Sequence, residues 1–112
     1  MNKYRNRKTV VDGICFDSKK EAQRYKILKA LERAGEIRDL RLQVPFELQP
    51  AFTYQGKRVR SIRYIADFTY YAPGENGHRV FVVEDTKGVR TKEYELKRKM
   101  FLFKNGFEIT EV

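Results

Sequence analysis

The chain has 112 residues, of which 41% are hydrophobic, and its 8 Phe and 7 Tyr supply enough apolar volume for one core. This composition excludes disorder over the whole length, so we expect one domain over residues 1–112. The 24 Lys and Arg against 15 Asp and Glu give a net charge of +9, and such an excess indicates a polyanionic partner.

No apolar stretch approaches the roughly 18 residues of a membrane span. The single cysteine, Cys15, excludes an intrachain disulfide and the usual Cys/His zinc sites, and its simplest role is that of a small buried hydrophobe. We therefore expect a cytoplasmic protein without a membrane partner. Residues 1–8 form a basic stretch that we expect to be a flexible arm.

A short hairpin and a helix are predicted first. Segments 9–11 and 14–16 flank an Asp-Gly dipeptide, which is typical of two-residue hairpin turns because both turn positions need a positive φ. Ser18 and Glu21 then match a capping box, and apolar residues at helical spacing follow it. These signals predict a helix over residues 19–34.

Strands and a second helix make up the rest of the chain. Alternating or β-branched apolar residues predict strands over 37–48, 61–71 and 80–85, with a turn at 54–57 between the first two. A second helix is expected between Thr91 and Gly106. Its buried side is expected to hold Tyr94, Leu96, Met100 and Phe103, and a last short strand starts at Phe107 and Ile109. The order helix, three strands, helix, strand predicts an α/β fold.

Two aspartates occupy related positions in two of these strands. The residue numbers of Asp67 and Asp85 add up to 152, twice the number of Asn76 in the middle of the intervening loop. If the strands pair as a hairpin, the two carboxylates lie opposite each other or one register step apart. Aspartate is a poor strand former and like charges across a ladder repel, so a bridging cation would remove the conflict.

Lys87 follows Asp85 by two residues, and the period of a strand places both side chains on one face. An all-oxygen site beside an ammonium group suits Mg²⁺ or Mn²⁺. This combination fits hydrolysis of a phosphodiester, in which the metal activates water and Lys87 orients the nucleophile and adds positive charge to the transition state.

These motifs resemble the PD-(D/E)XK nuclease superfamily. The resemblance depends on Ile65-Ala66-Asp67-Phe68 and Asp85-Thr86-Lys87, with Glu21 on the preceding helix. It implies a restriction-endonuclease-like core with a mixed central sheet after the N-terminal hairpin. It also implies that Asp67, Asp85 and Glu21 bind metal and, with Lys87, form the catalytic site. Ala66 stands where the superfamily often has proline.

A closer resemblance covers nearly the whole chain and joins it to small phage and prophage proteins of formerly unknown function. The matching stretches are 16–22, 35–37, 42–43, 64–68, 84–88 and 91–94. This similarity implies a metal-dependent DNA endonuclease of the bacterial host cytoplasm, related in style to Holliday junction resolvases and acting on branched or recombination DNA.

Three polar residues have a structural explanation beside the functional one. The capping box already accounts for Glu21. Glu84 is expected to face away from Asp85 and pair with a basic neighbour, unless a bulge turns it toward the site as a second-shell group. Gln43 could reach the site from the adjacent strand or be an ordinary polar strand residue.

Basic residues near two tyrosines, Tyr54 and Tyr64, and on the second helix are candidates for contacts with DNA phosphates. They are Arg58, Arg60, Arg63, Lys97, Arg98 and Lys99. The run on the helix is also what a solvated helix face looks like. A non-catalytic DNA-binding module that keeps the nuclease fold is therefore the alternative function. Because two cuts need two sites, we also expect a homodimer.

Overall fold

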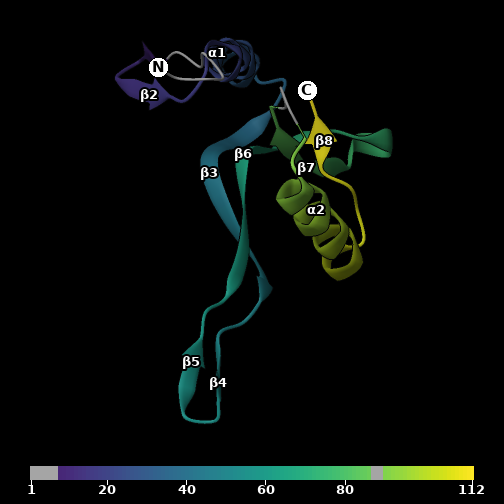
Figure 1. Ribbon diagram of the computed structural model, residues 1–112. Coiled ribbons are helices and arrows are strands. Elements are labelled where there is room, and N and C mark those ends of the chain that lie inside the picture. The colour runs from purple at the N-terminus through teal and green to yellow at the C-terminus, as the bar shows by residue number, and fades with distance from the viewer. Residues whose placement is uncertain (1–7, 87–89) are drawn as a thin grey trace. The chain divides into compact units, whose positions relative to one another are not determined.

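The computed structural model describes residues 8–86 and 90–112 (Figure 1). It shows a mixed α/β fold with two helices and a mixed central sheet, as the order of predicted elements requires. Residues 1–7 of the expected basic arm, and Lys87, lie outside the described residues.

The N-terminal hairpin is confirmed. Strands β1 (Thr9–Val11) and β2 (Ile14–Phe16) pair antiparallel, and Val11 lies opposite Ile14. The turn residues Asp12 and Gly13 both have positive φ, at 52° and 74°, as a type I′ turn requires. Cys15 of β2 is exposed, so the expectation of a buried thiol is wrong. Its neighbour Phe16 points to the opposite face of the strand and is buried instead.

Helix α1 (Lys19–Arg33) begins and ends as the sequence predicts to within one residue. The Ser18 hydroxyl accepts a 3.1 Å hydrogen bond from the backbone amide of Glu21. Gly35 follows the helix with a φ of 78°, a conformation that glycine adopts without strain. The buried positions of the helix are Glu21, Ala22, Tyr25 and Leu28.

The central sheet has the strand order β3-β6-β7-β8. It comprises β3 (Arg38–Gln49), β6 (Ile62–Pro73), β7 (Arg79–Asp85) and β8 (Thr110–Glu111). Strands β7 and β8 are parallel, and Asp85 pairs with Glu111. The last strand begins later than the sequence predicts, because Phe107 packs its ring against Phe101 at 5.4 Å before the chain joins the sheet.

Two short strands stand between β3 and β6 and form a sheet of their own. They are β4 (Phe52–Tyr54) and β5 (Lys57–Val59), antiparallel around the predicted turn. Figure 1 shows this hairpin at the far end of β3 and β6, away from α2. The sequence predicts the turn but not its flanking strands.

Helix α2 (Lys92–Asn105) has the expected ends. The Thr91 hydroxyl accepts a 3.0 Å bond from the amide of Tyr94, and Gly106 follows in the left-handed region. The predicted buried side is partly wrong, because Tyr94 is buried whereas Leu96 and Phe103 are exposed. Phe101, seven residues after Tyr94, points to the core. Two residues along a helix turn the side chain by about 200°, so Leu96 and Phe103 lie on the opposite side.

The described residues divide into two compact units, those of 8–40 with 70–81 and those of 41–69 with 82–86 and 90–112. Strands β3, β6 and β7 contribute residues to both. The first unit buries Phe16, Ala22, Tyr25, Leu28, Ile37 and Tyr70, and the second buries Tyr64, Ala66, Phe68, Val83, Tyr94, Phe101 and Ile109. Within the described ranges, no helix is long and apolar enough to cross a membrane.

Candidate functional site

Asp67 and Asp85 lie on neighbouring strands of the second unit. The Oδ2 atom of Asp67 accepts a 2.8 Å hydrogen bond from the backbone amide of Thr86. Thr86 directly follows Asp85, so the Asp67 carboxylate is held beside the end of β7 where Asp85 stands. The two aspartates thus lie near each other, as hairpin pairing of their strands predicts.

Residues on either side of the loop between β6 and β7 face each other as the predicted hairpin requires. The amide of Gly74 donates a 2.7 Å hydrogen bond to the carbonyl of His78, and the rings of Tyr71 and Phe81 lie 5.1 Å apart. Both pairs of residue numbers add up to 152, the sum that also relates the two aspartates. The turn around Asn76, whose φ is 56°, thus brings the adjoining ends of β6 and β7 together in the register that this sum describes.

Asp85 is buried, with only 4% of its surface exposed. Its Oδ2 accepts a 2.6 Å hydrogen bond from the hydroxyl of Tyr64, which is also buried. Burial, and then the hydrogen bond to Asp85, hold the pKa of Tyr64 far above its usual value of 10.0. Tyr64 therefore remains a protonated donor at physiological pH, and it fixes the orientation of the Asp85 carboxylate.

The ring of Tyr64 is held by an aromatic cluster. Its centroid lies 5.7 Å from that of Phe101, 6.3 Å from that of Phe46 and 6.4 Å from that of Tyr94. These distances fall within the range in which aromatic pairs attract each other. Helix α2 and strand β3 thus position the hydroxyl that contacts Asp85.

A hollow of about 270 Å³ opens in front of Asp85. Residues of β6, the end of β7 and the first turns of α2 line it, including Arg63 and Lys97. Lys97 is ion-paired to Glu93 at 3.1 Å, and both line the hollow. Asp67 is not among the described residues that line it. The hollow therefore presents one buried carboxylate beside two cations, an arrangement that can receive a phosphate group next to an acid.

Glu84 and Gln43 have unusual environments. Glu84 has no exposed surface, and a carboxylate buried so completely is stable only when it is paired or hydrogen-bonded. Gln43 is an exposed residue of β3 with a φ of 53°, a conformation that residues other than glycine seldom adopt. Backbone strain of this kind is frequent at functional sites. The structure therefore supports Gln43 as a candidate by a feature other than its place in the sequence.

Glu21 belongs to the first unit, whereas Asp67 and Asp85 belong to the second. Its backbone amide completes one half of the predicted capping box, and its side chain is buried. A carboxylate in the first turn of a helix is stabilised by the helix dipole. The structural explanation of Glu21 is thus directly visible, and its expected metal-binding role depends on the resemblance alone.

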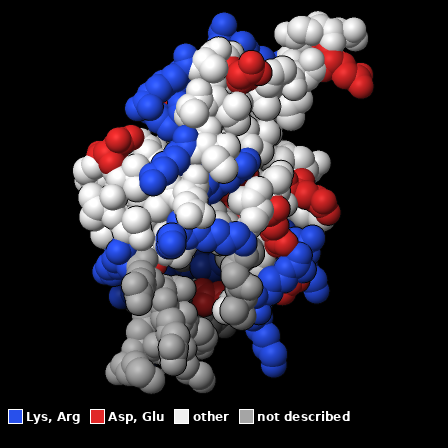
Figure 2. Space-filling model, turned by 90° about the horizontal axis from the view of Figure 1, so that it is seen from above, with Lys and Arg blue, Asp and Glu red and all other residues white. Residues whose placement is uncertain are grey.

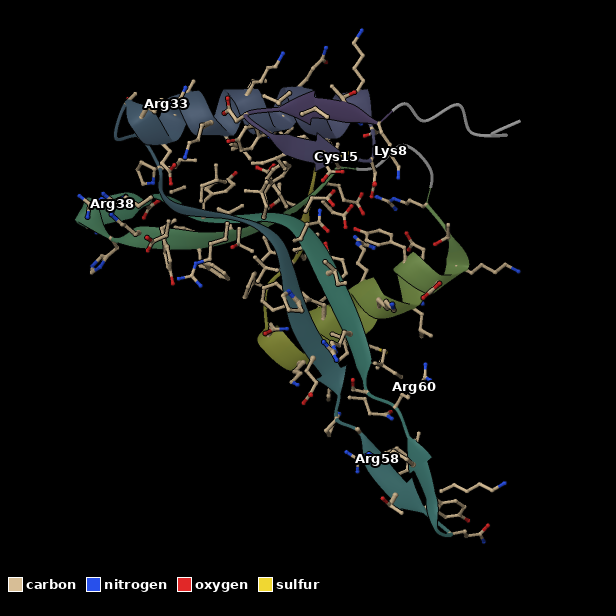
Figure 3. The ribbon with its side chains drawn as sticks, turned by 90° about the vertical axis from the view of Figure 1, so that its left-hand side faces the viewer. Lys8, Cys15, Arg33, Arg38, Arg58 and Arg60 are labelled. Carbon is tan, nitrogen blue, oxygen red and sulfur yellow. The ribbon has the colours of Figure 1, made fainter. Side chains whose placement is uncertain are left out.

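The residues expected to contact DNA differ in their exposure and in their ion pairs. Arg58 and Arg60 are exposed on the segment that carries β4 and β5 (Figure 3). Lys99 is exposed on α2, whereas Arg98 is half-buried and lies 3.7 Å from Glu95 and 3.8 Å from Glu111. Figure 2 shows basic side chains interspersed with acidic ones on the face it draws. Net charge alone therefore does not locate the site.

One cluster of polar side chains beside the site is not predicted by any sequence pattern. The hydroxyl of Tyr94 donates a 2.7 Å bond to Oε2 of Glu111, and Arg90 pairs with the same carboxylate. These hydrogen bonds hold the pKa of Glu111 below its usual 4.5, against the opposing effect of burial. The cluster ties α2 to β8, the strand next to Asp85. Residues 94 and 111 are far apart in sequence, and no local pattern signals their contact.

Two observations bear on whether this site can hold a metal. In the ranges 8–86 and 90–112, no three His, Cys, Asp or Glu side chains come together as a metal-binding group. The Oγ1 atom of Thr86 is buried and has no hydrogen-bond partner in the described part of the chain. Mg²⁺ is commonly held by one or two carboxylates together with water and substrate phosphates. Two aspartates with a neighbouring unsatisfied hydroxyl therefore fit Mg²⁺ or Mn²⁺ by their oxygen chemistry.

A family model described as "Protein of unknown function (DUF1064)" matches residues 1–110. The chain belongs to the DUF1064 family. No curated protein and no solved structure matches this DUF1064 chain. The DUF1064 match spans residues of both compact units, among them Asp67 and Asp85.

Proposed function

We propose that this protein is a Mg²⁺- or Mn²⁺-dependent DNA endonuclease that hydrolyses phosphodiester bonds. The observation that carries the proposal is the hydrogen bond from the Thr86 amide to Asp67, which holds that carboxylate beside the buried Asp85. Two neighbouring carboxylates cost stability in any fold, and a DNA-binding surface alone does not need them. A bound divalent cation that acts on DNA phosphates would explain why both carboxylates are present.

The chain's own residues have distinct parts in this proposal. Asp67 and Asp85 hold the metal, which supplies activation of water and neutralisation of phosphate charge when bound. Tyr64 keeps the Asp85 carboxylate in one orientation. Arg63 and Lys97, at the hollow in front of Asp85, attract the phosphate backbone. A carboxylate can accept several hydrogen bonds, so those from Tyr64 and Thr86 leave room for metal binding.

The remaining parts of the proposal derive from the sequence. Lys87 adds a cation that orients the nucleophile, and Glu21 completes the metal ligands. The element order is compatible with a restriction-endonuclease-like core. We further propose that the enzyme is phage-encoded, acts in the bacterial host cytoplasm as a homodimer, and prefers branched DNA of recombination or replication.

Cleavage of a DNA panel tests the activity. Purified protein is incubated with four-way junctions, flaps, nicked duplex and linear duplex in Mg²⁺, in Mn²⁺ and in EDTA. We expect metal-dependent cleavage by the wild type and a loss of at least a hundredfold in Asp67→Asn and Asp85→Asn. Both amides still accept a hydrogen bond at the position of the carboxylate oxygen, so the fold is retained while the charge is lost.

The matched control is Glu108→Gln, which neutralises an exposed carboxylate in the same unit. It should cleave like the wild type. Equal cleavage by Asp85→Asn and the wild type would exclude the proposed site. Sedimentation of the protein with and without DNA tests the homodimer, which a monomer under both conditions contradicts.

A non-catalytic DNA-binding module is the second candidate. It is favoured by the finding that no group of three or more metal-binding side chains forms within the described residues. This function predicts salt-sensitive DNA binding that is equal in EDTA and in Mg²⁺, without cleavage. Calorimetric titration with Mn²⁺ separates the two: heat of binding that disappears in Asp85→Asn supports the nuclease, and no heat in either protein supports the module.

A further inference from the structure

The β4–β5 hairpin is a two-stranded ribbon with a defined register. Phe52 lies opposite Val59, and Tyr54 lies opposite Lys57. The turn residues Gln55 and Gly56 have φ angles of 48° and 74°, so the tip is a type I′ turn, whose twist matches that of the flanking strands. The ribbon is therefore a shaped element rather than an irregular loop.

Its two faces differ in chemistry. Residues opposite each other in an antiparallel pair share a face, and residues two apart in a strand do so as well. Phe52, Tyr54, Lys57 and Val59 are thus on one face. Phe52 is 44% exposed and Tyr54 is 62% exposed, so this face presents two aromatic side chains to solvent.

The other face, and the chain around the ribbon, are basic. Thr53 lies opposite Arg58 on the second face. Residues 48–66 contain no Asp or Glu, but they contain four cations: Lys57, Arg58, Arg60 and Arg63. None of the ion pairs between described residues involves any of these four. Figure 3 shows Arg58 and Arg60 along this segment.

This combination is complementary to unpaired nucleotides. Aromatic residues favour strands, but Phe52 and Tyr54 remain largely exposed on this hairpin, and exposed apolar surface of this kind is available for binding. The rings of residues two apart on a strand are separated by about 6.8 Å, which is about two base-stacking steps. Stacking on aromatic rings together with cations along the backbone is how proteins bind single strands without reading their sequence.

We propose that the β4–β5 hairpin binds unpaired nucleotides of DNA, with Phe52 and Tyr54 stacking on bases and Lys57, Arg58 and Arg60 contacting phosphates. The inference rests on the proposed function, because DNA is the substrate there. The inference further specifies that the hairpin recognises the unpaired part of the DNA substrate. A branch point or flap offers such unpaired bases, whereas an intact duplex does not.

Binding in EDTA tests the hairpin independently of cleavage. An oligonucleotide that carries 2-aminopurine reports stacking by quenching of its fluorescence, and anisotropy gives its affinity. We expect Phe52→Ala and Tyr54→Ala each to weaken single-strand binding by about fivefold or more and to reduce the quenching. Tyr54→Phe should retain both properties because it keeps the ring. Arg58→Ala should lower the salt dependence of binding.

The matched control is Thr53→Ala on the opposite face, which should bind like the wild type. Circular dichroism verifies that each variant is folded. Unchanged single-strand affinity in the Phe52→Ala Tyr54→Ala double variant overturns the inference. So does an equal loss of affinity for intact duplex. A shift of that variant from dimer to monomer in sedimentation, with affinity unchanged, assigns the aromatic face to a second copy of the chain instead.

The two proposals fail in different ways. Wild-type protein that quenches 2-aminopurine but never cleaves DNA contradicts the nuclease and leaves the hairpin assignment intact. Wild-type protein that cleaves branched DNA while the hairpin variants bind normally contradicts only the hairpin assignment.

Discussion

The hydroxyl of Tyr64 and the carboxylate of Asp85 form a buried hydrogen bond of 2.6 Å, joining the middle of the aromatic cluster to the end of β7. An aspartate at a buried strand position loses hydration, and a hydrogen bond from a protonated phenol compensates for part of that loss. The raised pKa of Tyr64 ensures that the donor stays protonated. Packing of α2 on the sheet thus determines the orientation of a candidate metal ligand.

Tyr64→Phe removes this hydrogen bond while keeping the ring in its cluster. We expect the free energy of unfolding to fall by about 1.5–3 kcal/mol, because the buried carboxylate loses a donor. Urea unfolding measures the change. Tyr71→Phe is the control, since Tyr71 is exposed and should change stability by less than about 0.5 kcal/mol. Equal effects of the two substitutions contradict the importance of the buried bond.

Phe101 and Phe103 on α2 should respond in opposite ways to truncation. Phe101 is fully buried and touches the rings of Phe46, Tyr64 and Phe107, so Phe101→Ala should cost about 3–5 kcal/mol. Phe103 is 94% exposed, so Phe103→Ala should change stability by less than about 0.5 kcal/mol. Thermal unfolding of both variants measures the difference. A large loss in Phe103→Ala would mean that a partner or a second copy covers it.

The helix ends and hairpin turns were predictable because their signals are local. Ser18, Thr91 and Gly106 act within one turn of their own position, and the turn at Asp12 needs only its two residues. The buried side of α2 was not predictable in the same way. Its sequence carries two apolar stripes, and only the rings of β3 and β6 decide which one is covered.

Some contacts of the candidate site could also be predicted from the sequence, and others could not. The pairing of Asp67 with the end of β7 could be predicted because one hairpin register relates both residues. The contacts of Tyr64 with Asp85 and of Tyr94 with Glu111 could not, since each joins residues 17 or more positions apart and no single period connects them. The positive φ of Gln43 likewise has no signal in its residue type.

Gly74 should be intolerant of any side chain, because an added Cβ would lie 2.8 Å from the carbonyl oxygen of His78 and 2.8 Å from a methyl group of Val80. We expect Gly74→Ala to lower stability by about 1–3 kcal/mol and to disturb the turn that sets the register of β6 and β7. Asn76→Gly is the control, because Asn76 already has a positive φ that glycine adopts without strain. Chemical denaturation of both variants checks the contrast, which a neutral Gly74→Ala contradicts.

Glu111 should make stability depend on acid pH. Its pKa in the folded protein lies below the usual 4.5, chiefly because of the Tyr94 hydrogen bond, so its contribution is complete above pH 4.5. That contribution is lost as the pH falls through the folded pKa. We expect Glu111→Gln to be about 1 kcal/mol less stable than the wild type at pH 7, with the difference shrinking below pH 4.5. Urea unfolding from pH 7 to pH 3 measures it, with Glu108→Gln as the exposed control. A difference that stays constant with pH contradicts the role of this carboxylate.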